Sequence, residues 1–495
     1  MFLSIDIGTT NLKAGLFDED GSCKVVSSRQ TPYGTHPDDR YTYIDPQALW
    51  SNIAELIEEV LGSFRSPHVR AVSITSMAES GLLLNADTGK PATEIIPWFD
   101  DSSIEYVNFI NNNIDSFAQF CKTGLHTSFK YGLAKLLWLR ERDPSLFNQN
   151  VVWLSISSFI GYCLTGEIAE EQTLAARTFV YQIDKNKWDD ATITHFDFNP
   201  KLFPHVTHCL KPIGNVKKDV NKLGLNFETK VYLAGHDHIC SSLAAGIVTS
   251  GHVYNSMGTA ETLVGTFTKR KLTLEDYESG LSFGIHPIDN MYFWMGGHSS
   301  SGGSIEWMRD ILGDDRLTYE KINSYLEQAD EGPTGIIFYP YLSGSGAPNP
   351  NPHAKAAFLG LKKVHQKPDL LKAVLEGNAF QMEMIREAAE TTTRLSISTM
   401  SVIGGGVRNP YWMQIKADVS FIDLFLPNIT EAALCGAALT AATGEGIYPT
   451  LKDAVAATIK ADNMVVQPDH EMYKQYRQIY KDQYKPISKM IEKFS

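Results

Sequence analysis

Apolar and polar positions divide the chain into strand-like and helix-like stretches. Short apolar runs typical of buried strands lie at residues 3–7, 69–84, 231–234, 253–257 and 402–404. Apolar side chains recur at helical spacing at residues 46–61, 132–142, 157–164, 304–311, 370–389 and 431–442, and a small-residue helix is predicted at 241–246. Strands mixed with helices in both halves predict an α/β protein, with a mixed sheet in each half.

A short Gly-Thr hairpin occurs twice in the chain. The first copy places Gly8 and Thr9 between two apolar stretches, and the second places Gly258 and Thr259 in the same pattern, 250 positions later. Each copy predicts a strand, a tight turn and a second strand. Glycine lets the backbone approach a ligand, and the amides and hydroxyls that follow can bind phosphate oxygens. Two such turns predict two lobes that grip one polyphosphate.

Length and charge limit the possible organisation. A chain of 495 residues is too long for one core, and 43% hydrophobic with 20% charged residues is typical of a globular protein. A strand-rich block starts near residue 251, which predicts one domain at 1–248 and another at 249–495. The net charge of −13 argues against a general nucleic-acid surface. A local turn or helix N-terminus can still bind a small anion.

The cysteines and the apolar runs indicate a location. Six cysteines are scattered without a C-x-x-C pair, so reduced thiols are the simplest interpretation. Asp6 interrupts the first apolar run, which argues against a signal peptide, and no apolar stretch approaches the length of a membrane span. We therefore predict a cytoplasmic protein with no membrane partner.

Asp6 stands at a strand end beside the first Gly-Thr turn. A carboxylate there can hold Mg²⁺ while the turn amides meet phosphates. The alternative is an aspartate that caps the turn, which is common after strands. The repeated turn and the nearby Lys13 favour the metal.

Asp237 follows an apolar strand and lies between His236 and His238. A carboxylate at the mouth of a sheet is well placed to accept a proton from a substrate hydroxyl. Asp237 can equally be the N-cap of a helix that begins near Ile239, and one aspartate can serve both purposes. The two histidines lack a third ligand in the sequence, so no metal site is predicted there.

The order of these motifs resembles the FGGY family of carbohydrate kinases over nearly the full length. Residues 6–13 match the pattern D-x-G-T-[ST]-x-x-[KR], residues 301–307 match S-G-G-x-x-x-W, and residues 404–418 match the family's adenosine-binding segment. The resemblance implies the two-lobed actin-like (ribonuclease H-like) ATPase fold with a cleft between the domains. It also implies ATP, Mg²⁺ and phosphorylation of a hydroxyl of a small carbohydrate.

The resemblance assigns a role to each matching residue. It implies Asp6 as the aspartate associated with Mg²⁺, Asp237 as the catalytic base and His238 as a neighbour of the sugar. It implies that the nucleotide is bound by Thr9, Thr10, Asn11, Lys13, Gly258, Thr259, Gly302, Glu306, Gly405 and Asn409.

The expected substrate loop departs from both xylulose and glycerol kinases. Glu79 matches the glycerol-kinase glutamate, but Ala78 replaces its arginine, and the xylulose-kinase histidine is absent. Asp100 lies in a W-x-D sequence that both groups share. Lys130 stands where glycerol kinases place a tyrosine that stacks on substrate, and it marks either an acidic sugar or an ordinary surface lysine. The substrate therefore stays open among a ketose, a polyol and a sugar acid, with substrate contacts expected from Glu79, Asp100, Asp237 and His238.

A second class of function uses the same fold. Actin-like domains also serve as ATP-dependent switches and scaffolds without sugar chemistry. The carboxylates Glu79, Asp100 and Asp237 favour the kinase, because a switch needs no hydroxyl-binding cluster beside the γ-phosphate. The sequence is compatible with a homodimer but does not determine the oligomeric state.

Overall fold

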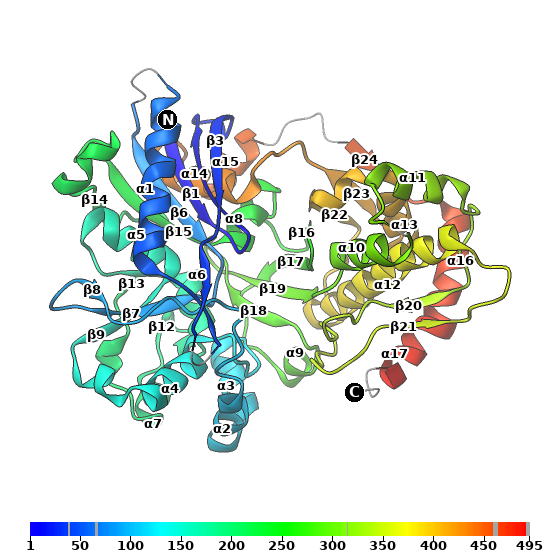
Figure 1. Ribbon diagram of the computed structural model, residues 1–495, viewed down its shortest axis with the longest axis horizontal. Coiled ribbons are helices and arrows are strands. Elements are labelled where there is room, and N and C mark those ends of the chain that lie inside the picture. The colour runs from blue at the N-terminus through cyan, green and yellow to red at the C-terminus, as the bar shows by residue number, and fades with distance from the viewer. Residues whose placement is uncertain (38–39, 65–67, 314, 459–463, 492–495) are drawn as a thin grey trace.

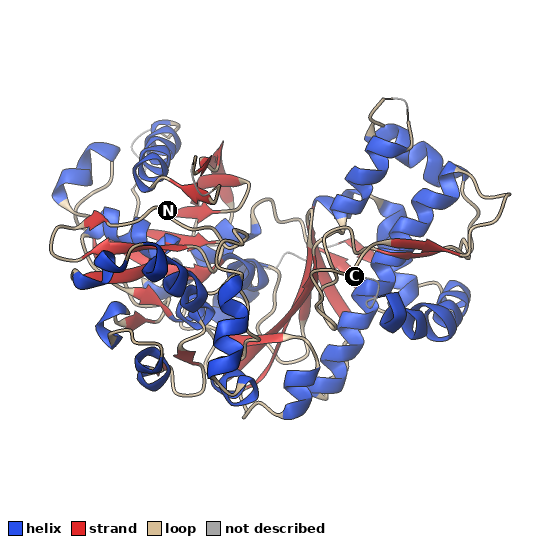
Figure 2. Cartoon of the chain, turned by 60° about the horizontal axis from the view of Figure 1, so that its bottom comes forward, coloured by secondary structure: helices blue, strands red, loops and turns tan. Residues whose placement is uncertain are grey.

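The computed structural model describes residues 1–37, 40–64, 68–313, 315–458 and 464–491. The chain forms two lobes, each built around one large sheet (Figure 1). Figure 2 shows the two sheets in red as separate blocks with helices around each. An α/β protein with a mixed sheet in each half is therefore confirmed.

The first lobe contains a 6-stranded sheet in the order β14-β15-β6-β1-β2-β3. Its strands are β1 (Phe2–Ile7), β2 (Asn11–Phe17), β3 (Cys23–Gln30), β6 (Ala71–Ser76), β14 (Gly214–Asn215) and β15 (Lys230–His236). Strands β1, β2 and β3 are antiparallel, whereas β6 pairs in parallel with both β1 and β15. Ile7, Ser76 and His236 lie in register, so the three parallel strands end at one edge of the sheet.

Helices cover both faces of this sheet, which explains why β1 is buried at nearly every position. Leu3 and Ile5 pack in one apolar cluster with α1 (Pro46–Gly62) and α5 (Ile156–Thr165). Phe2, on the opposite face, packs with α14 (Ala432–Gly444). Alternate residues of one strand thus contribute to two different cores.

The second lobe contains a 7-stranded sheet in the order β18-β19-β17-β16-β22-β23-β24. Its strands are β16 (Val253–Met257), β17 (Glu261–Thr268), β18 (Ser282–Ile285), β19 (Met291–His298), β22 (Thr399–Gly404), β23 (Asp423–Leu426) and β24 (Met464–Val466). Strands β16 and β17 form an antiparallel hairpin, as β1 and β2 do, and β22 pairs in parallel with β16, as β6 does with β1. Both Gly-Thr sequences therefore form the predicted hairpins, on equivalent strands of the two sheets.

Two helices of the C-terminal half return to the first lobe. α14 and α15 (Leu451–Thr458), orange in Figure 1, lie beside β1 and β3. Leu434 and Ala438 share an apolar cluster with Phe2 and Ala71. The division at residue 249 stays a prediction, because the chain after it contributes to both lobes.

Predicted helices are confirmed with some differences in their first residues. The stretches at 46–61 and 157–164 form α1 and α5, and 132–142 forms α4 (Gly132–Arg142). Three helices begin earlier than predicted, namely α8 (Asp237–Ala244), α10 (Gly302–Ile311) and α12 (Lys367–Thr393). In α12 a proline occupies the first turn, and Gln366 and Asp369 form a capping box, so polar residues start the helix before its apolar pattern.

Shorter elements complete the two lobes. Further helices are α2 (Glu105–Asn113), α3 (Ser116–Thr123), α6 (Gln172–Ala175), α7 (Asp190–His195), α9 (Leu274–Glu278), α11 (Tyr319–Gln328), α13 (Pro410–Ser420), α16 (His470–Ile479) and α17 (Lys485–Ile491). Further strands are β4 (Tyr33–Thr35), β5 (Thr42–Ile44), β7 (Gly81–Asn85), β8 (Lys90–Pro91), β9 (Val151–Ser155), β10 (Glu170–Glu171), β11 (Tyr181–Gln182), β12 (Lys187–Trp188), β13 (Val206–Thr207), β20 (Ile337–Tyr339) and β21 (Ala357–Leu359). Across the described ranges, no helix has both the length and the apolar character that crossing a bilayer requires.

The contact between α14 and α8 gives a stability prediction. A Cβ added at Gly436 would lie 1.9 Å from the carbonyl oxygen of Cys240, whereas at Gly62 it would meet no described atom within 4 Å. We expect Gly436→Ala to destabilise the protein by about 1–3 kcal/mol through overpacking. Gly62→Ala, also in a helix, should be neutral or stabilise it by up to ~1 kcal/mol. Thermal unfolding of both variants measures the difference, and equal midpoints would contradict this account of the α8–α14 contact.

Candidate active site

The first predicted phosphate turn joins β1 to β2. The amide of Gly8 donates to the carbonyl oxygen of Asn11 at 3.1 Å, and an added Cβ at Gly8 would lie 2.9 Å from that oxygen. The indole N–H of Trp98 donates to the Thr9 hydroxyl at 2.9 Å. Position 8 therefore requires glycine for steric reasons, and the Trp98 side chain, next to the predicted sugar contact Asp100, fixes the turn.

Lys13, a predicted phosphate contact, already has a partner. Its Nζ lies 2.6 Å from Oε2 of Glu431, and both side chains are about a quarter exposed (27% and 26%). Thr10 is exposed and Asn11 is half-buried on the same turn. A phosphate that binds Lys13 must therefore share the ammonium with Glu431 or displace this carboxylate.

Asp6 lies near the end of β1 and carries a strongly perturbed carboxyl group. Burial raises the pKa of Asp6 to about 8, and the negative charge of Asp237 adds to the rise, while Lys13 lowers it. Its buried Oδ1 has no hydrogen-bond partner among the described residues. The site therefore holds an uncompensated oxygen donor at the first phosphate turn.

Asp237 is the first residue of α8, directly after β15. Its Oδ1 accepts a hydrogen bond from the backbone N–H of His238 at 2.6 Å. Burial raises the pKa of Asp237 to about 7, that N–H lowers it, and the charge of Glu79 raises it. The N-cap of α8 is His236, so the alternative that Asp237 caps a helix starting near Ile239 is wrong. The carboxylate is 26% exposed, which leaves it accessible to a substrate hydroxyl.

Of the two histidines beside Asp237, His238 connects the lobes and His236 lies against Asp237 itself. Nδ1 of His238 lies 2.7 Å from the hydroxyl oxygen of Tyr254, which belongs to β16 of the second lobe. Nε2 of His236 lies 3.3 Å from Oδ1 of Asp237. Burial lowers the pKa of His238 to about 4 and that of His236 well below its usual range, so both imidazoles are neutral at pH 7. In the described part of the chain, no three His, Cys, Asp or Glu side chains cluster as metal ligands.

The second predicted phosphate turn is bound to the start of α10. Gly258 and Thr259 are exposed between β16 and β17. The amide of Gly302 donates to the carbonyl oxygen of Gly258 at 3.1 Å, and that of Gly303 to the carbonyl oxygen of Thr259 at 3.0 Å. Helix α10, which carries Gly302 and Glu306 of the predicted adenosine residues, is therefore fixed directly to this turn.

A buried ion pair beneath the second turn was not predicted from the sequence. Nζ of Lys416 lies 2.5 Å from Oε1 of Glu261, and both side chains are fully buried. Asn255 donates to the same oxygen at 2.7 Å, and the Ser301 hydroxyl donates to Oε2 at 2.6 Å. Removing either charge would leave the other buried and unpaired, which is costly. The signal in the sequence was a lysine inside the apolar run of α13.

The predicted adenosine residues have different surroundings. Glu306 accepts hydrogen bonds from Arg309 at 2.8 Å and from the Tyr319 hydroxyl at 2.5 Å. Asn409 is the N-cap of α13. No described atom comes within 4 Å of a Cβ added at Gly405, so the space beside this glycine is open. Glu306 is thus held by protein groups, while the backbone at Gly405 stays accessible.

The structure pairs Glu79, a predicted sugar contact, with an arginine that sequence analysis missed. The Nε and Nη2 atoms of Arg177 lie 2.6 and 2.5 Å from Oε1 of Glu79. Glu79 adopts a left-handed backbone conformation with φ 59°, which is uncommon outside glycine, asparagine and aspartate. The negative charge of Glu79 raises the pKa of Asp237, and the negative charge of Asp237 raises the pKa of Asp6. Glu79, Asp237 and Asp6 therefore interact electrostatically in one site.

Asp100 is buried and engaged by backbone amides. Its Oδ2 accepts a hydrogen bond from the amide of Thr42 at 2.6 Å, and its Oδ1 from that of Ser102 at 3.1 Å. These bonds hold the loop after Trp98 against the strand β5. A sugar contact by Asp100 stays a prediction.

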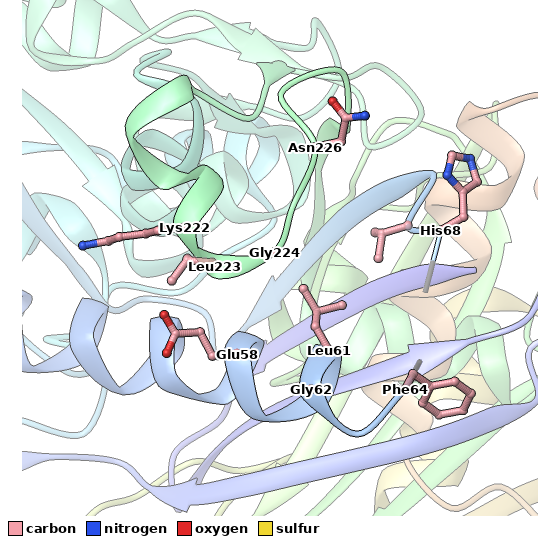
Figure 3. Close-up of a pocket in the computed structure, with 10 residues that line it drawn as sticks. Glu58, Leu61, Gly62, Phe64, His68, Lys222, Leu223, Gly224 and Asn226 are labelled. Carbon is pink, nitrogen blue, oxygen red and sulfur yellow. The ribbon is translucent and has the colours of Figure 1, made fainter. Parts of the chain in front are cut away.

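A surface pocket elsewhere in the first lobe has no connection with these residues. Its volume is about 640 Å³, and Figure 3 shows its lining from the end of α1, the 3₁₀ helix η4 (Lys218–Leu223) and the segment before β6. Glu58, Lys222 and His68 are among the lining residues, and no predicted site residue belongs to them.

Comparisons with known proteins identify the family of the chain. Residues 1–244 match the N-terminal domain of the FGGY family of carbohydrate kinases, and residues 253–445 match its C-terminal domain. The chain is 26% identical to a xylulose kinase of Staphylococcus epidermidis over 99% of this chain and 97% of the relative. It is 27% identical to a glycerol kinase of Acaryochloris marina over 92% of each chain.

Solved structures share the fold. The gluconate kinase from Lactobacillus acidophilus superposes with a TM-score of 0.92 at 22% identity, over 100% of this chain and 98% of the other. The xylulose kinase from the same organism gives a TM-score of 0.91 at 22% identity, over 100% and 99%. The predicted two-lobed actin-like fold is confirmed. The prediction that the chain is a phosphotransferase, rather than a non-catalytic switch, is confirmed as well. The chain belongs to the FGGY family of carbohydrate kinases and is an enzyme for the ATP-dependent phosphorylation of a small carbohydrate.

Proposed function

We propose that Asp237 is the catalytic base of this kinase and that the acceptor is a primary hydroxyl of a polyol, ketose or sugar acid. The observation that carries the proposal is the raised pKa of an accessible carboxylate at the end of β15, about 7, in a site with two other carboxylates. A base that titrates near neutrality is well matched to accepting a hydroxyl proton.

The proposed step transfers one proton and one phosphoryl group. The substrate O–H gives its proton to Asp237 as its oxygen forms a bond to the γ-phosphorus of ATP. The bond from that phosphorus to the bridging oxygen breaks, and ADP leaves. Because phosphoryl transfer depends mainly on positioning and electrostatics, rigid turns at strand ends suit this reaction.

The phosphate contacts are proposed to come from both hairpins. Thr9, Thr10, Asn11 and Lys13 would bind from the first lobe, and Gly258 and Thr259 from the second. The fixed geometry of both turns supports this role, since neither must be ordered when ATP binds. The adenosine would lie against Gly302, Glu306, Gly405 and Asn409, where open space beside Gly405 supports close approach of the nucleotide.

The donor set at the first turn fits Mg²⁺. A hard cation prefers carboxylate oxygens, and Asp6 offers a buried oxygen without a hydrogen-bond partner. Mg²⁺ commonly takes one or two carboxylates and completes its coordination with phosphate oxygens and water. When bound, the ion would neutralise charge on the transferred phosphate, and Asp6 would hold it. Asp237, and Glu79 in its pair with Arg177, would face the sugar rather than the ion.

The scattered cysteines also support a cytoplasmic location with reduced thiols. No nucleic-acid or membrane partner is proposed, and a homodimer stays open. His238 would contact the sugar through the nitrogen that does not meet Tyr254.

Asp237→Asn tests the proposed base. The amide keeps the size of the side chain but cannot accept the proton, so turnover should fall by roughly 10²–10⁴-fold. ATP binding and the thermal midpoint should stay close to those of the wild type. Asp219→Asn, at a side chain that is 72% exposed, is the matched control and should be fully active. A folded Asp237→Asn enzyme with wild-type turnover on its substrate would refute the mechanism.

The pKa of Asp237 predicts a pH dependence. The deprotonated carboxylate is the active form and its pKa is raised to about 7, so activity is lost as the pH falls below this value. We expect kcat/KM for the sugar to rise about tenfold per pH unit below neutrality and then to level off. Assays at saturating ATP between pH 5.5 and 8.5 measure this profile. A flat profile across that range would contradict the assignment.

Glu79→Gln tests the sugar side. The change removes the charge that pairs with Arg177 but keeps the shape of the side chain. Since hydrogen bonds to a charged group contribute roughly 1.5–3 kcal/mol, KM for the sugar should rise about tenfold or more. KM for ATP should change little, because Glu79 is not among the nucleotide contacts. An unchanged KM for the sugar would show that Glu79 does not bind it.

A further inference from the structure

We propose that the substrate carries a carboxylate and that Lys130, with Arg177 beside it, recognises this group. The inference rests on the proposed function, because it concerns the substrate of the same site. It narrows the choice among ketose, polyol and sugar acid to a polyhydroxy acid. The argument starts from the balance of charges around Glu79.

Three cationic side chains surround Glu79. Arg177 pairs with its carboxylate, and the Nζ of Lys135 donates to its backbone carbonyl oxygen at 2.5 Å. The charges of Glu79 and Arg177 both act on the pKa of Lys130, which places Lys130 in the same cluster. The same two charges act on the pKa of His238, the neighbour of the proposed base: Glu79 raises it and Arg177 lowers it. The cluster is therefore part of the catalytic site.

Two of the three cations are engaged by the protein. The charge of Arg177 is balanced by Glu79. Lys135 is completely buried, and its Nζ donates to two backbone carbonyl oxygens, those of Glu79 and Lys130, the second at 2.7 Å. Burial lowers the pKa of Lys135 to about 7, and the two carbonyl oxygens accept hydrogen bonds from its Nζ. Its bonds also fix the backbone of Lys130 next to that of Glu79.

Lys130 is the cation that forms no ion pair with a described residue, although the charge of Glu79 acts on it. Its Nζ lies 5.0 Å from the centroid of the Trp98 ring, and no carboxylate of the described residues forms an ion pair with it. The indole N–H of Trp98 binds the Thr9 hydroxyl of the first phosphate turn. The half-buried ammonium of Lys130 therefore lies over the ring of Trp98, and the same ring is hydrogen-bonded to the predicted phosphate turn. A stable protein normally pairs such a charge, so the missing anion is expected from a ligand.

Arg177 supplies a second, independent sign of a missing anion. Its Nη1 is buried and has no hydrogen-bond partner among the described residues, although Nε and Nη2 are satisfied by Glu79. Buried nitrogen donors are seldom left unpaired. A guanidinium and an ammonium on neighbouring elements form a suitable receptor for a carboxylate.

A polyhydroxy acid satisfies every group of this site. Its carboxylate would meet Lys130 and Arg177, its middle hydroxyls would donate to Glu79, and its terminal hydroxyl would face Asp237. A neutral ketose or polyol would leave the charge of Lys130 unpaired when substrate binding displaces water. The site therefore favours the acid over the neutral compound of the same carbon skeleton.

Matched pairs of substrates test the inference. Phosphorylation is measured for aldonates of four, five and six carbons and for the alditols of the same configuration, with ATP saturating. We expect the acid to be preferred in kcat/KM by roughly 10–100-fold, the range for hydrogen bonds to a charged group. Equal or better use of the alditols would overturn the inference and leave the proposed kinase intact. Ketoses of four to six carbons complete the panel: activity on a ketose without activity on any aldonate would overturn the inference alone, and inactivity on all three classes would overturn both.

Substitution of Lys130 tests whether this residue determines the preference for the acid over the neutral substrate. Lys130→Met should lower the ratio of acid to neutral kcat/KM at least tenfold, whereas Lys130→Arg should keep most of it. Lys90→Met, at an exposed lysine on β8, is the control and should leave the ratio unchanged. Thermal unfolding verifies that each variant is folded. An unaltered ratio in folded Lys130→Met would show that Lys130 does not recognise the carboxylate.

Discussion

The parallel pairing of β1, β6 and β15 is the constraint on which the active site depends. Asp6 and Asp237 are 231 positions apart, yet β6 pairs with both strands and brings their ends to one edge of the sheet. Parallel strands end on the same side, which is where α/β proteins place ligands. Two carboxylates at one buried edge repel each other, and burial raises the pKa of both. The fold thus creates negative charge that a cation or a proton must neutralise.

Several groups expected to meet ligands already have partners within the protein. Lys13 pairs with Glu431, Glu79 with Arg177, and Glu306 with Arg309. These pairs keep charged side chains ordered before a ligand arrives, and ligand binding must then exchange one ion pair for another. The Lys13 pair also ties β2 to the start of α14, so a phosphate that draws Lys13 away would loosen a contact between the two halves of the chain. Preorganisation and the response to ATP therefore involve the same side chains.

The proposed sugar side of the site differs from the proposed phosphate side in its charge. Lys130, Lys135 and Arg177 gather around Glu79, whereas carboxylates dominate the end where ATP would deliver phosphate. A substrate with a carboxylate at one end and a hydroxyl at the other would be oriented by this contrast. The orientation would present the terminal hydroxyl to Asp237, and a chain of hydroxyls would span the distance between the two ends.

The sequence by itself determined the hairpins, most helices, the α/β class and the family, because these depend on local pattern and on motif order. It also singled out Asp6, Asp237 and Glu79, which stand at strand ends or turns with recognisable neighbours. Only the tertiary structure decided the partners. Arg177 pairs with a glutamate 98 positions away, and Lys416 with one 155 positions away. The return of α14 to the first lobe was equally hidden, since an alanine-rich helix fits either core. Long-range ion pairs arise from the packing of sheets and helices. The periodicity of apolar residues along the chain does not indicate which distant side chain will pair with a buried charge.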